Sequence, residues 1–156
     1  MSPTLAAART RRFHQLDVFA DQPFKGNPLA VVHDAEGLDD STMAAFARWT
    51  NLSETTFLLP PSDPLLADYR VRIHTPGGEL PFAGHPTLGC CHAWLVAGGE
   101  PREPGVVVQE CGVGLVRIRR GSADAPDRLA FAAPPLRRSG PLDDALLQRI
   151  VQALAV

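Results

Sequence analysis

The fold is decided by the stretch Gly78-Glu79-Leu80-Pro81-Phe82-Ala83-Gly84-His85-Pro86-Thr87-Leu88-Gly89, which is typical of a short strand, a tight turn and a helix start. We expect Gly84 at the turn because a Cβ there would clash with the chain. Pro86 suits the first helical turn, where its missing N–H leaves nothing unsatisfied. The residues from Thr87 to Ala97 are apolar on almost every side, and the glycines after them end a helix. Such a helix belongs in a core, so we place it at the centre of the domain.

The start of this helix is also the first candidate for a functional site. Free backbone N–H groups and a positive dipole gather at a helix N-terminus, where they attract anions. His85 adds a side chain that can donate to an anionic group or exchange a proton with it. A small carboxylate is therefore the first ligand to consider. The alternative is an ordinary strand–turn–helix joint in which His85 caps the helix.

Composition indicates a globular protein and argues against two classes of partner. The chain has 156 residues, of which 45% are hydrophobic, enough for one domain with a core. The formal net charge of −2 gives no electrostatic reason to expect binding to nucleic acid or to an anionic membrane. No window approaches the length of a membrane span, and Met1 to Arg12 lacks the apolar core of a signal peptide. We expect a cytoplasmic location and a frayed tail before Phe13.

The cysteines and histidines predict neither a disulfide framework nor a metal site. Cys90, Cys91 and Cys111 are odd in number and two are adjacent, which fits a reducing compartment. Together with His85 and His92 they match no metal-binding spacing, and adjacent helix residues point about 100° apart. The loops also lack a phosphate-binding glycine pattern. We expect no metal and no cofactor.

The rest of the chain predicts more strands than helices. Alternating or β-branched apolar runs predict strands, and amphipathic runs after acidic N-caps predict helices. The expected strands are 13–19, 29–32, 54–59, 68–74, 106–108, 113–118 and 128–131, and the expected outer helices are 42–49 and 142–154. The strands follow one another as hairpins rather than as βαβ units. This favours an α+β domain in which a largely antiparallel, curved sheet wraps around the central apolar helix.

Glu54 is the second candidate for chemistry. It stands in Ser53-Glu54-Thr55-Thr56-Phe57 at the entrance to an apolar strand, where a carboxylate is partly desolvated and suited to general acid/base work. The alternative is a rim glutamate paired with an arginine. Hydroxyl groups of Ser53 and Thr87 and the backbone N–H of Gly84 would surround a ligand held by His85. Three further polar residues beside turns are candidates, with the alternative that they only satisfy turn backbone groups: Asp17, Asn27 and Glu79.

Three stretches of the chain, taken in order, resemble one family. They are Phe19 to Val32, which contains Asn27-Pro28-Leu29-Ala30-Val31-Val32; Leu52-Ser53-Glu54-Thr55-Thr56-Phe57; and Arg72-Ile73-His74-Thr75-Pro76 with the stretch quoted first. In this order and at this spacing they resemble the phenazine-biosynthesis-like (PhzF-like) isomerases, which share the diaminopimelate epimerase fold. The resemblance covers about residues 13 to 135. It implies two pseudo-symmetric domains, each a sheet around a central helix, with the active site in the cleft between them.

The resemblance also implies cofactor-free proton transfer on a small carboxylic acid. Glu54 matches the family's acid/base glutamate, and His85 matches the histidine of its Gly-His-Pro turn. Ala83 stands where related epimerases have a catalytic cysteine, which favours the glutamate mechanism over racemisation by two thiols. The residues that match substrate-binding positions are Ser53, Gly84, Pro86 and Thr87.

Length is the departure from the family, whose members are nearly twice as long. The resemblance divides the chain into a flexible tail (1–12), an epimerase-like N-terminal domain (13–133), and a linker with the first helix of an incomplete second domain (134–156). A weak repeat agrees with this, because Leu38-Asp39-Asp40 recurs as Leu142-Asp143-Asp144 before an amphipathic run. Two functions stay open: an isomerase or epimerase, and a truncated or degenerate half that binds a ligand or needs a partner chain to complete the cleft. A homodimer is a candidate assembly.

Overall fold

The structure, a computed structural model, describes residues 9–121, 125, 128–133 and 139–155. Three helices and eight strands lie within this part of the chain. In chain order they are β1 Phe13–Val18, β2 Asn27–Val32, α1 Asp40–Thr50, β3 Glu54–Leu59, β4 Tyr69–Thr75, β5 Gly78–Leu80, α2 Gly84–Val96, β6 Val106–Cys111, β7 Gly114–Arg120, β8 Leu129–Phe131 and α3 Asp144–Leu154.

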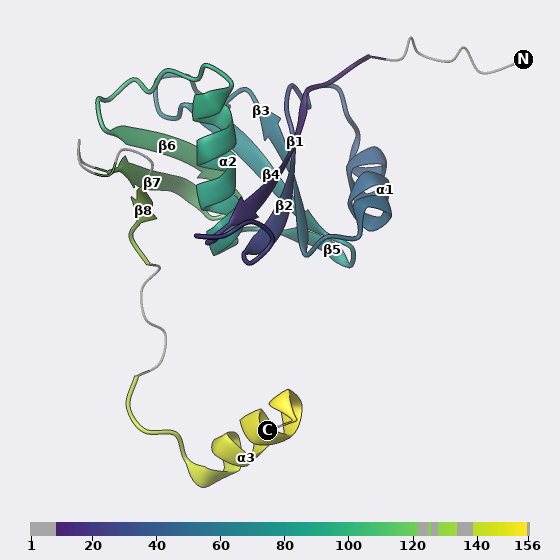
Figure 1. Ribbon diagram of the computed structural model, residues 1–156, viewed down its shortest axis with the longest axis vertical. Helices are drawn as coiled ribbons and strands as arrows, with labels where there is room; N and C mark the ends of the chain where they lie inside the picture. Colours follow the sequence, from purple (N-terminus) through teal and green to yellow (C-terminus); the bar gives the residue numbers. More distant parts are fainter. Residues whose placement is uncertain (1–8, 122–124, 126–127, 134–138, 156) are drawn as a thin grey trace, which may run out of the picture.

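One curved sheet contains all the described strands, in the order β1-β2-β3-β4-β6-β7-β8, with β5 paired to β4. Most pairs are antiparallel, including the predicted hairpins β1–β2 and β6–β7. Figure 1 shows the sheet curling around α2, with α1 on its outer side. The α+β class and the sheet wrapped around the apolar helix are confirmed.

The prediction of hairpins without βαβ units is wrong at two places. β2 pairs with β3 in parallel, and β4 pairs with β6 in parallel. Parallel neighbours need a long crossover, which α1 supplies for the first pair and α2 supplies for the second. The two helices therefore cover opposite faces of the sheet (Figure 1).

The central helix α2 is held against the sheet by a close approach at Gly89. A Cβ on Gly89 would lie 2.4 Å from Cδ2 of Leu29 and 3.0 Å from Cγ2 of Val18, so a side chain has no room there. Gly84, in contrast, has an ordinary backbone conformation, and its Cβ would meet only the ring of Phe131 at 3.5 Å. The expected clash at Gly84 is thus wrong, and the glycine that packing requires is Gly89. The buried residues of α2 are His85, Pro86, Thr87, Gly89, Cys90, Cys91 and Ala93.

One side of α2 remains uncovered between the two outer strands of the sheet. β1 and β8 flank the helix, and a hollow of about 600 Å³ lies between them, lined in part by Leu16, Leu88, His92 and Leu129. Figure 1 shows α2 facing the viewer with no strand in front of it. We expected α2 to be surrounded by the core. This is true of most of its faces, but not of the face between β1 and β8.

The outer helix α1 packs on the sheet through a second apolar cluster. Asp39 caps its start by accepting from the backbone N–H of Thr42, as predicted for the acidic N-cap. Met43 is buried and packs with Val32 and Phe57 of the sheet, while Phe46 is partly buried against the same cluster.

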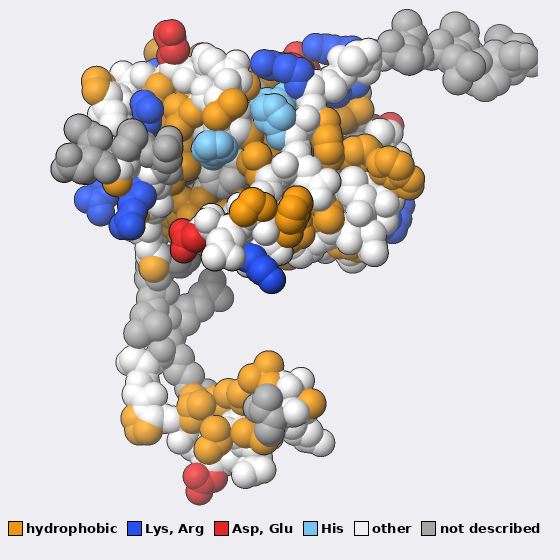
Figure 2. All heavy atoms as spheres, in the orientation of Figure 1, with side chains coloured by type: hydrophobic (Ala, Val, Ile, Leu, Met, Phe, Trp, Pro, Cys, Tyr) orange, Lys and Arg blue, Asp and Glu red, His pale blue; other side chains and the backbone are white. Residues whose placement is uncertain are grey.

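The last helix, α3, repeats the construction of α1. Asp143 caps it by accepting from the backbone N–H of Leu146, and its C-terminal cap is a left-handed residue, as in α1. No residue of α3 is buried, and apolar side chains gather on its surface in Figure 2. The division at 133/134 stays a prediction, since residues 134–138 lie outside the described part, as do residues 1–8 of the expected tail. No described helix is long and apolar enough to cross a membrane.

Candidate active site

Glu54 and His85 face each other where β3 begins and α2 begins. The Oε2 atom of Glu54 lies 3.2 Å from Nε2 of His85, and the side chains are only 15% and 9% exposed. The two atoms are close but not aligned as a regular hydrogen bond, and neither has a hydrogen-bond partner among the described residues. A buried acid and a buried base with free hydrogen-bonding capacity are therefore held at contact distance, which is the arrangement that proton transfer requires.

Asn27 and Ser53 extend this pair into a line of polar side chains. Nδ2 of Asn27 lies 3.2 Å from Nδ1 of His85, and Oγ of Ser53 donates to Oδ1 of Asn27 at 2.9 Å. The parallel register explains the meeting, because Leu29 of β2 lies opposite Glu54 of β3. The first residues of both strands thus lie at the same edge of the sheet, beside the start of α2.

Burial controls the charge of His85. Loss of solvent lowers the pKa of His85 below its ordinary value, and the nearby Glu54 carboxylate opposes this in part. The ring is therefore biased toward its neutral form, in which one nitrogen donates and the other accepts.

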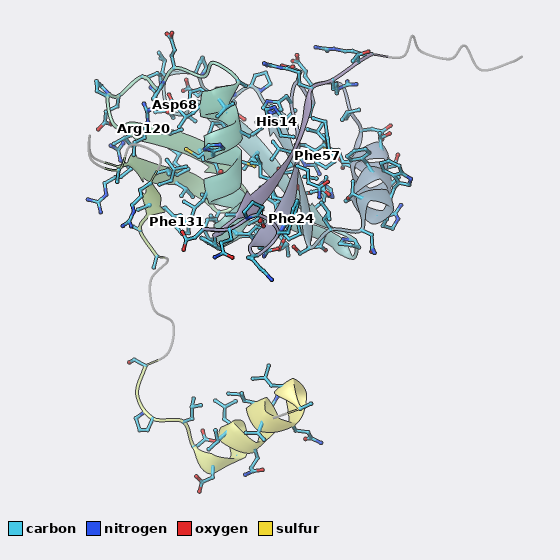
Figure 3. All side chains as sticks on the ribbon, in the orientation of Figure 1. His14, Phe24, Phe57, Asp68, Arg120 and Phe131 are labelled. Carbon is cyan, nitrogen blue, oxygen red and sulfur yellow. The ribbon has the colours of Figure 1, made fainter. Side chains whose placement is uncertain are left out.

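The start of α2 offers backbone donors beside the pair. Ala83 occupies the N-cap position and provides no side-chain hydrogen bond to the helix. The early N–H groups of a helix have no partner within the helix itself, so Gly84 and His85 present theirs to any ligand at this point. The aromatic rings of Phe82 and Phe131 stack edge to face, 5.6 Å apart, on the neighbouring side. Figure 3 shows Phe131 on β8, near this end of α2.

The structure brings four of the six predicted site residues together, and the other two follow His85 in the first turn of α2. Glu54, His85, Ser53 and Gly84 lie at the shared edge described above. Pro86 and Thr87 are buried.

The hydroxyl of Thr87 is already committed within the domain. It donates to the carbonyl of Ala83 at 2.9 Å and accepts from Nε2 of Gln109 at 3.1 Å. Thr87 therefore braces the helix start, and its direct contact with a substrate stays a prediction that this geometry does not favour.

The polar residues beside turns have different contacts. Asp17 accepts from the backbone N–H groups of Lys25 and Gly26, as the turn interpretation expects. Glu79 instead forms an ion pair with Arg72 on the sheet. Asn27 is the site residue that sequence reasoning missed, because a turn interpretation explained it equally well, although it lies within a motif that carried the family resemblance.

Other reactive groups do not form a second site of this kind. Burial raises the pKa of both Cys90 and Cys91 to about 12, so their thiols stay protonated and unreactive. Within the described residues, no group of three or more His, Cys, Asp and Glu side chains could hold a metal ion.

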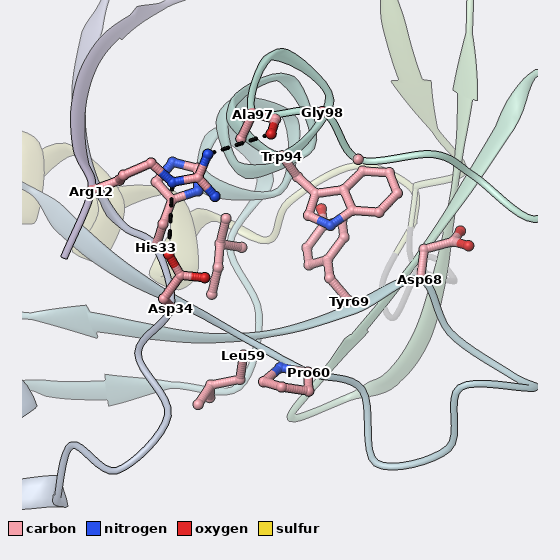
Figure 4. Close-up of a pocket in the computed structure, with 12 residues that line it drawn as sticks. Arg12, His33, Asp34, Leu59, Pro60, Asp68, Tyr69, Trp94, Ala97 and Gly98 are labelled. Carbon is pink, nitrogen blue, oxygen red and sulfur yellow. Dashed lines mark hydrogen bonds and ion pairs between the residues drawn. The ribbon is translucent and has the colours of Figure 1, made fainter.

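A separate cavity lies at the opposite, C-terminal end of α2 (Figure 4). It has a volume of about 290 Å³. Arg12 crosses it, donating to the carbonyl of Ala97 at 3.4 Å and pairing with Asp34 at 3.7 Å. Arg12 therefore ties the entry to β1 to the end of the helix, which is a structural role.

Comparison with known proteins places the chain in a family. Residues 16–140 match the family described as phenazine biosynthesis-like protein. The chain is 46% identical over 123 residues to antisense-enhancing sequence 1 of Schizosaccharomyces pombe, covering 78% of this chain and 41% of that protein. It is 50% identical over 78 residues to the trans-2,3-dihydro-3-hydroxyanthranilate isomerase of Pseudomonas aeruginosa, covering 50% of this chain and 27% of that enzyme.

A solved structure agrees with the sequence matches. The phenazine biosynthesis protein of the PhzF family from Bacillus anthracis superposes with a TM-score of 0.64 at 32% identity, covering 72% of this chain and 37% of that one. The resemblance inferred from the three motifs is thereby confirmed. The chain spans less than half the length of these relatives.

Proposed function

We propose that this chain, which belongs to the phenazine biosynthesis-like protein family, carries the acid/base half of a cofactor-independent isomerase or epimerase acting on a small carboxylic acid. The observation that carries the proposal is the buried contact of 3.2 Å between Glu54 and His85 beside the uncapped start of α2. The pair supplies a proton acceptor and donor, and the helix start supplies an anion site.

In this proposal each group has a defined task. The carboxylate of the substrate is bound by the backbone N–H groups of Gly84 and His85. Glu54 removes a proton from a carbon of the substrate and returns it to another carbon, or to the other face of the same carbon. The C–H bond that breaks is replaced by the C–H bond that forms, so the reaction needs neither an oxidant nor a cofactor. His85 donates to the charge that develops on the substrate.

The relatives suggest the first substrate to test. One similar enzyme is named for the isomerisation of trans-2,3-dihydro-3-hydroxyanthranilate, which carries a carboxylate and a mobile proton. We propose this compound, or a small cyclic acid like it, as the class that fits the site.

The test is deuterium incorporation. The protein is incubated with trans-2,3-dihydro-3-hydroxyanthranilate in D2O, and the substrate protons and product are followed by proton NMR. We expect deuterium in the product, and loss of roughly 10²-fold or more of the rate in Glu54→Gln, which keeps the shape but cannot act as a base. Glu79→Gln is the matched control, because the carboxylate of Glu79 is already paired with Arg72. Unchanged exchange in Glu54→Gln would refute the role of Glu54.

A second candidate function follows from the uncovered side of α2. The hollow between β1 and β8 is open, and the relatives are more than twice as long as the part of them that is matched. In this alternative the chain is a non-catalytic half that binds a ligand or is completed by another chain. Absence of exchange, combined with a folded monomer in light scattering, would favour it. A homodimer and a cytoplasmic location stay predictions.

A further inference from the structure

A continuous line of four polar side chains crosses the site from one strand start to the other. Two hydrogen bonds run from Ser53 Oγ to Asn27 Oδ1 at 2.9 Å and from Asn27 Nδ2 to His85 Nδ1 at 3.2 Å, and the line ends in the 3.2 Å contact between His85 Nε2 and Glu54 Oε2, which is not aligned as a hydrogen bond. The line joins residues 58 positions apart, Asn27 and His85. The two inner members, Asn27 and His85, each have a neighbour on both sides, so the position of a proton in one contact constrains the next contact.

The direction of the line follows from the donors that are available. A carboxylate that acts as a base only accepts hydrogen bonds, so Nε2 of His85 must carry the proton that faces Glu54. Burial disfavours the doubly protonated ring, so Nδ1 must be the acceptor. The group of Asn27 that faces Nδ1 is then its NH2, which leaves its oxygen to accept from Ser53.

The opposite orientation of the Asn27 amide is unfavourable at the contact between His85 and Glu54. With Oδ1 of Asn27 against Nδ1, the ring proton would lie on Nδ1. The lone pair of Nε2 would then face the carboxylate of Glu54, with both atoms buried. That arrangement leaves two acceptors opposed without a proton between them, which is costly in a buried site.

We propose that Asn27 is a positioning residue that holds the ring of His85 in the tautomer with its proton on Nε2, the nitrogen that lies 3.2 Å from Glu54. Ser53 orients Asn27 by donating to its oxygen. Glu54 is then the resting proton acceptor, and His85 is the donor. The assignment of tasks to Glu54 and His85 rests on the proposed function, whereas the tautomer is a property of the chain without any substrate.

The test reads the ring nitrogens directly. The chain is labelled with 15N-histidine, and long-range proton–nitrogen correlation spectra are recorded at neutral pH. We expect the Nε2 signal of His85 to be that of a protonated nitrogen and the Nδ1 signal to be that of an unprotonated one. His92 is exposed and serves as an internal reference, because a solvated ring samples both tautomers.

Two substitutions make the result specific. Asn27→Asp removes the NH2 donor and keeps the shape, so we expect Nδ1 of His85 to become protonated, while His92 is unchanged. Asn27→Ala removes both groups, so we expect a mixture of tautomers. Thermal melting checks that each variant is folded. Protonation at Nδ1 in the unaltered chain, or an unchanged pattern in folded Asn27→Asp, would overturn the proposal.

The same variants separate this inference from the proposed function. In the deuterium assay we expect Asn27→Asp to lower the maximal rate roughly 10²-fold and to shift its pH profile, with little change in KM. If His85 shows the expected tautomer but Glu54→Gln retains full activity, the proposed function fails and the role of Asn27 in setting the tautomer stands.

Discussion

His74 lies on β4 beneath α1 with neither of its ring nitrogens hydrogen-bonded. Its side chain is 3% exposed, and both nitrogens are buried without a partner among the described residues. The ring packs edge to face against Phe57 with centroids 5.5 Å apart. Because buried polar atoms without partners destabilise a fold, we expect His74→Phe to raise the free energy of unfolding by about 1 kcal/mol at neutral pH. Urea denaturation measures this value.

His92→Phe is the control for that prediction. His92 is exposed on α2, so its replacement should change the free energy of unfolding by less than about 0.5 kcal/mol. A large loss of stability in His74→Phe, with His92→Phe unchanged, would mean that ordered water satisfies the ring nitrogens of His74.

Side chains that carry out chemistry can be predicted from the sequence, whereas the side chains that position them are missed. Glu54 and His85 can be predicted because their residue types and neighbours suggest chemistry. Asn27 could not be separated from an ordinary turn residue, because its partner His85 is distant in the chain. The turn interpretation of Glu79 also fails, since the carboxylate pairs with Arg72 across two strands. Contacts of this kind depend on strand register, which a local pattern does not contain.

Gly89 sets the distance between α2 and the sheet. In Gly89→Ala the new Cβ would lie 2.4 Å from Leu29, which is fully buried and has little freedom to move. Overpacking of this type costs about 1–3 kcal/mol, whereas alanine gains about 1 kcal/mol of helix propensity over glycine. We expect the clash to win, with a net loss of about 1 kcal/mol of stability. Thermal and urea denaturation should both show the loss.

Gly84→Ala is the matched control within the same helix. Its Cβ would meet Phe131 at 3.5 Å, an ordinary contact, so we expect no loss of stability and a gain of up to about 1 kcal/mol from the helix propensity of alanine. Equal stability of the two alanine variants would show that the sheet relaxes around Gly89 at no cost.

Element positions and the hairpins β1–β2 and β6–β7 were predictable from the chain, but the parallel pairs β2–β3 and β4–β6 were not. Alternation and turn residues locate β1, β4 and β7, and an acidic N-cap locates α1 and α3. The same patterns do not predict that β3 pairs with β2 as well as with β4. That choice depends on α1 filling the crossover and packing Met43 against Phe57, which is a tertiary effect.

Three buried histidines make the stability of the whole protein depend on pH. Burial is the main cause that lowers the pKa of His33, His74 and His85 below the ordinary value of 6.5. The neighbours of His33 are His14 and Arg12, which lower its pKa further, and Asp34, which opposes them. The unfolded chain therefore binds more protons than the folded chain just below pH 6.5, so stability rises with pH through this range.

The histidines affect stability in a higher pH range than the carboxylates do. Hydrogen bonds lower the pKa of Asp39, Glu79 and Glu110, whose ordinary values are 3.8 for the aspartate and 4.5 for the glutamates. The stability that these carboxylates contribute is present above those values and is lost only as the pH falls below them. We therefore expect constant stability above the ordinary histidine pKa of about 6.5, a first decline as the pH falls below it, and a second decline below about pH 4.5. Urea denaturation at half-unit pH steps measures the curve. The first decline should become shallower in His74→Phe and stay unchanged in His92→Phe, and a curve that is flat from pH 7 to 5 would contradict the linkage.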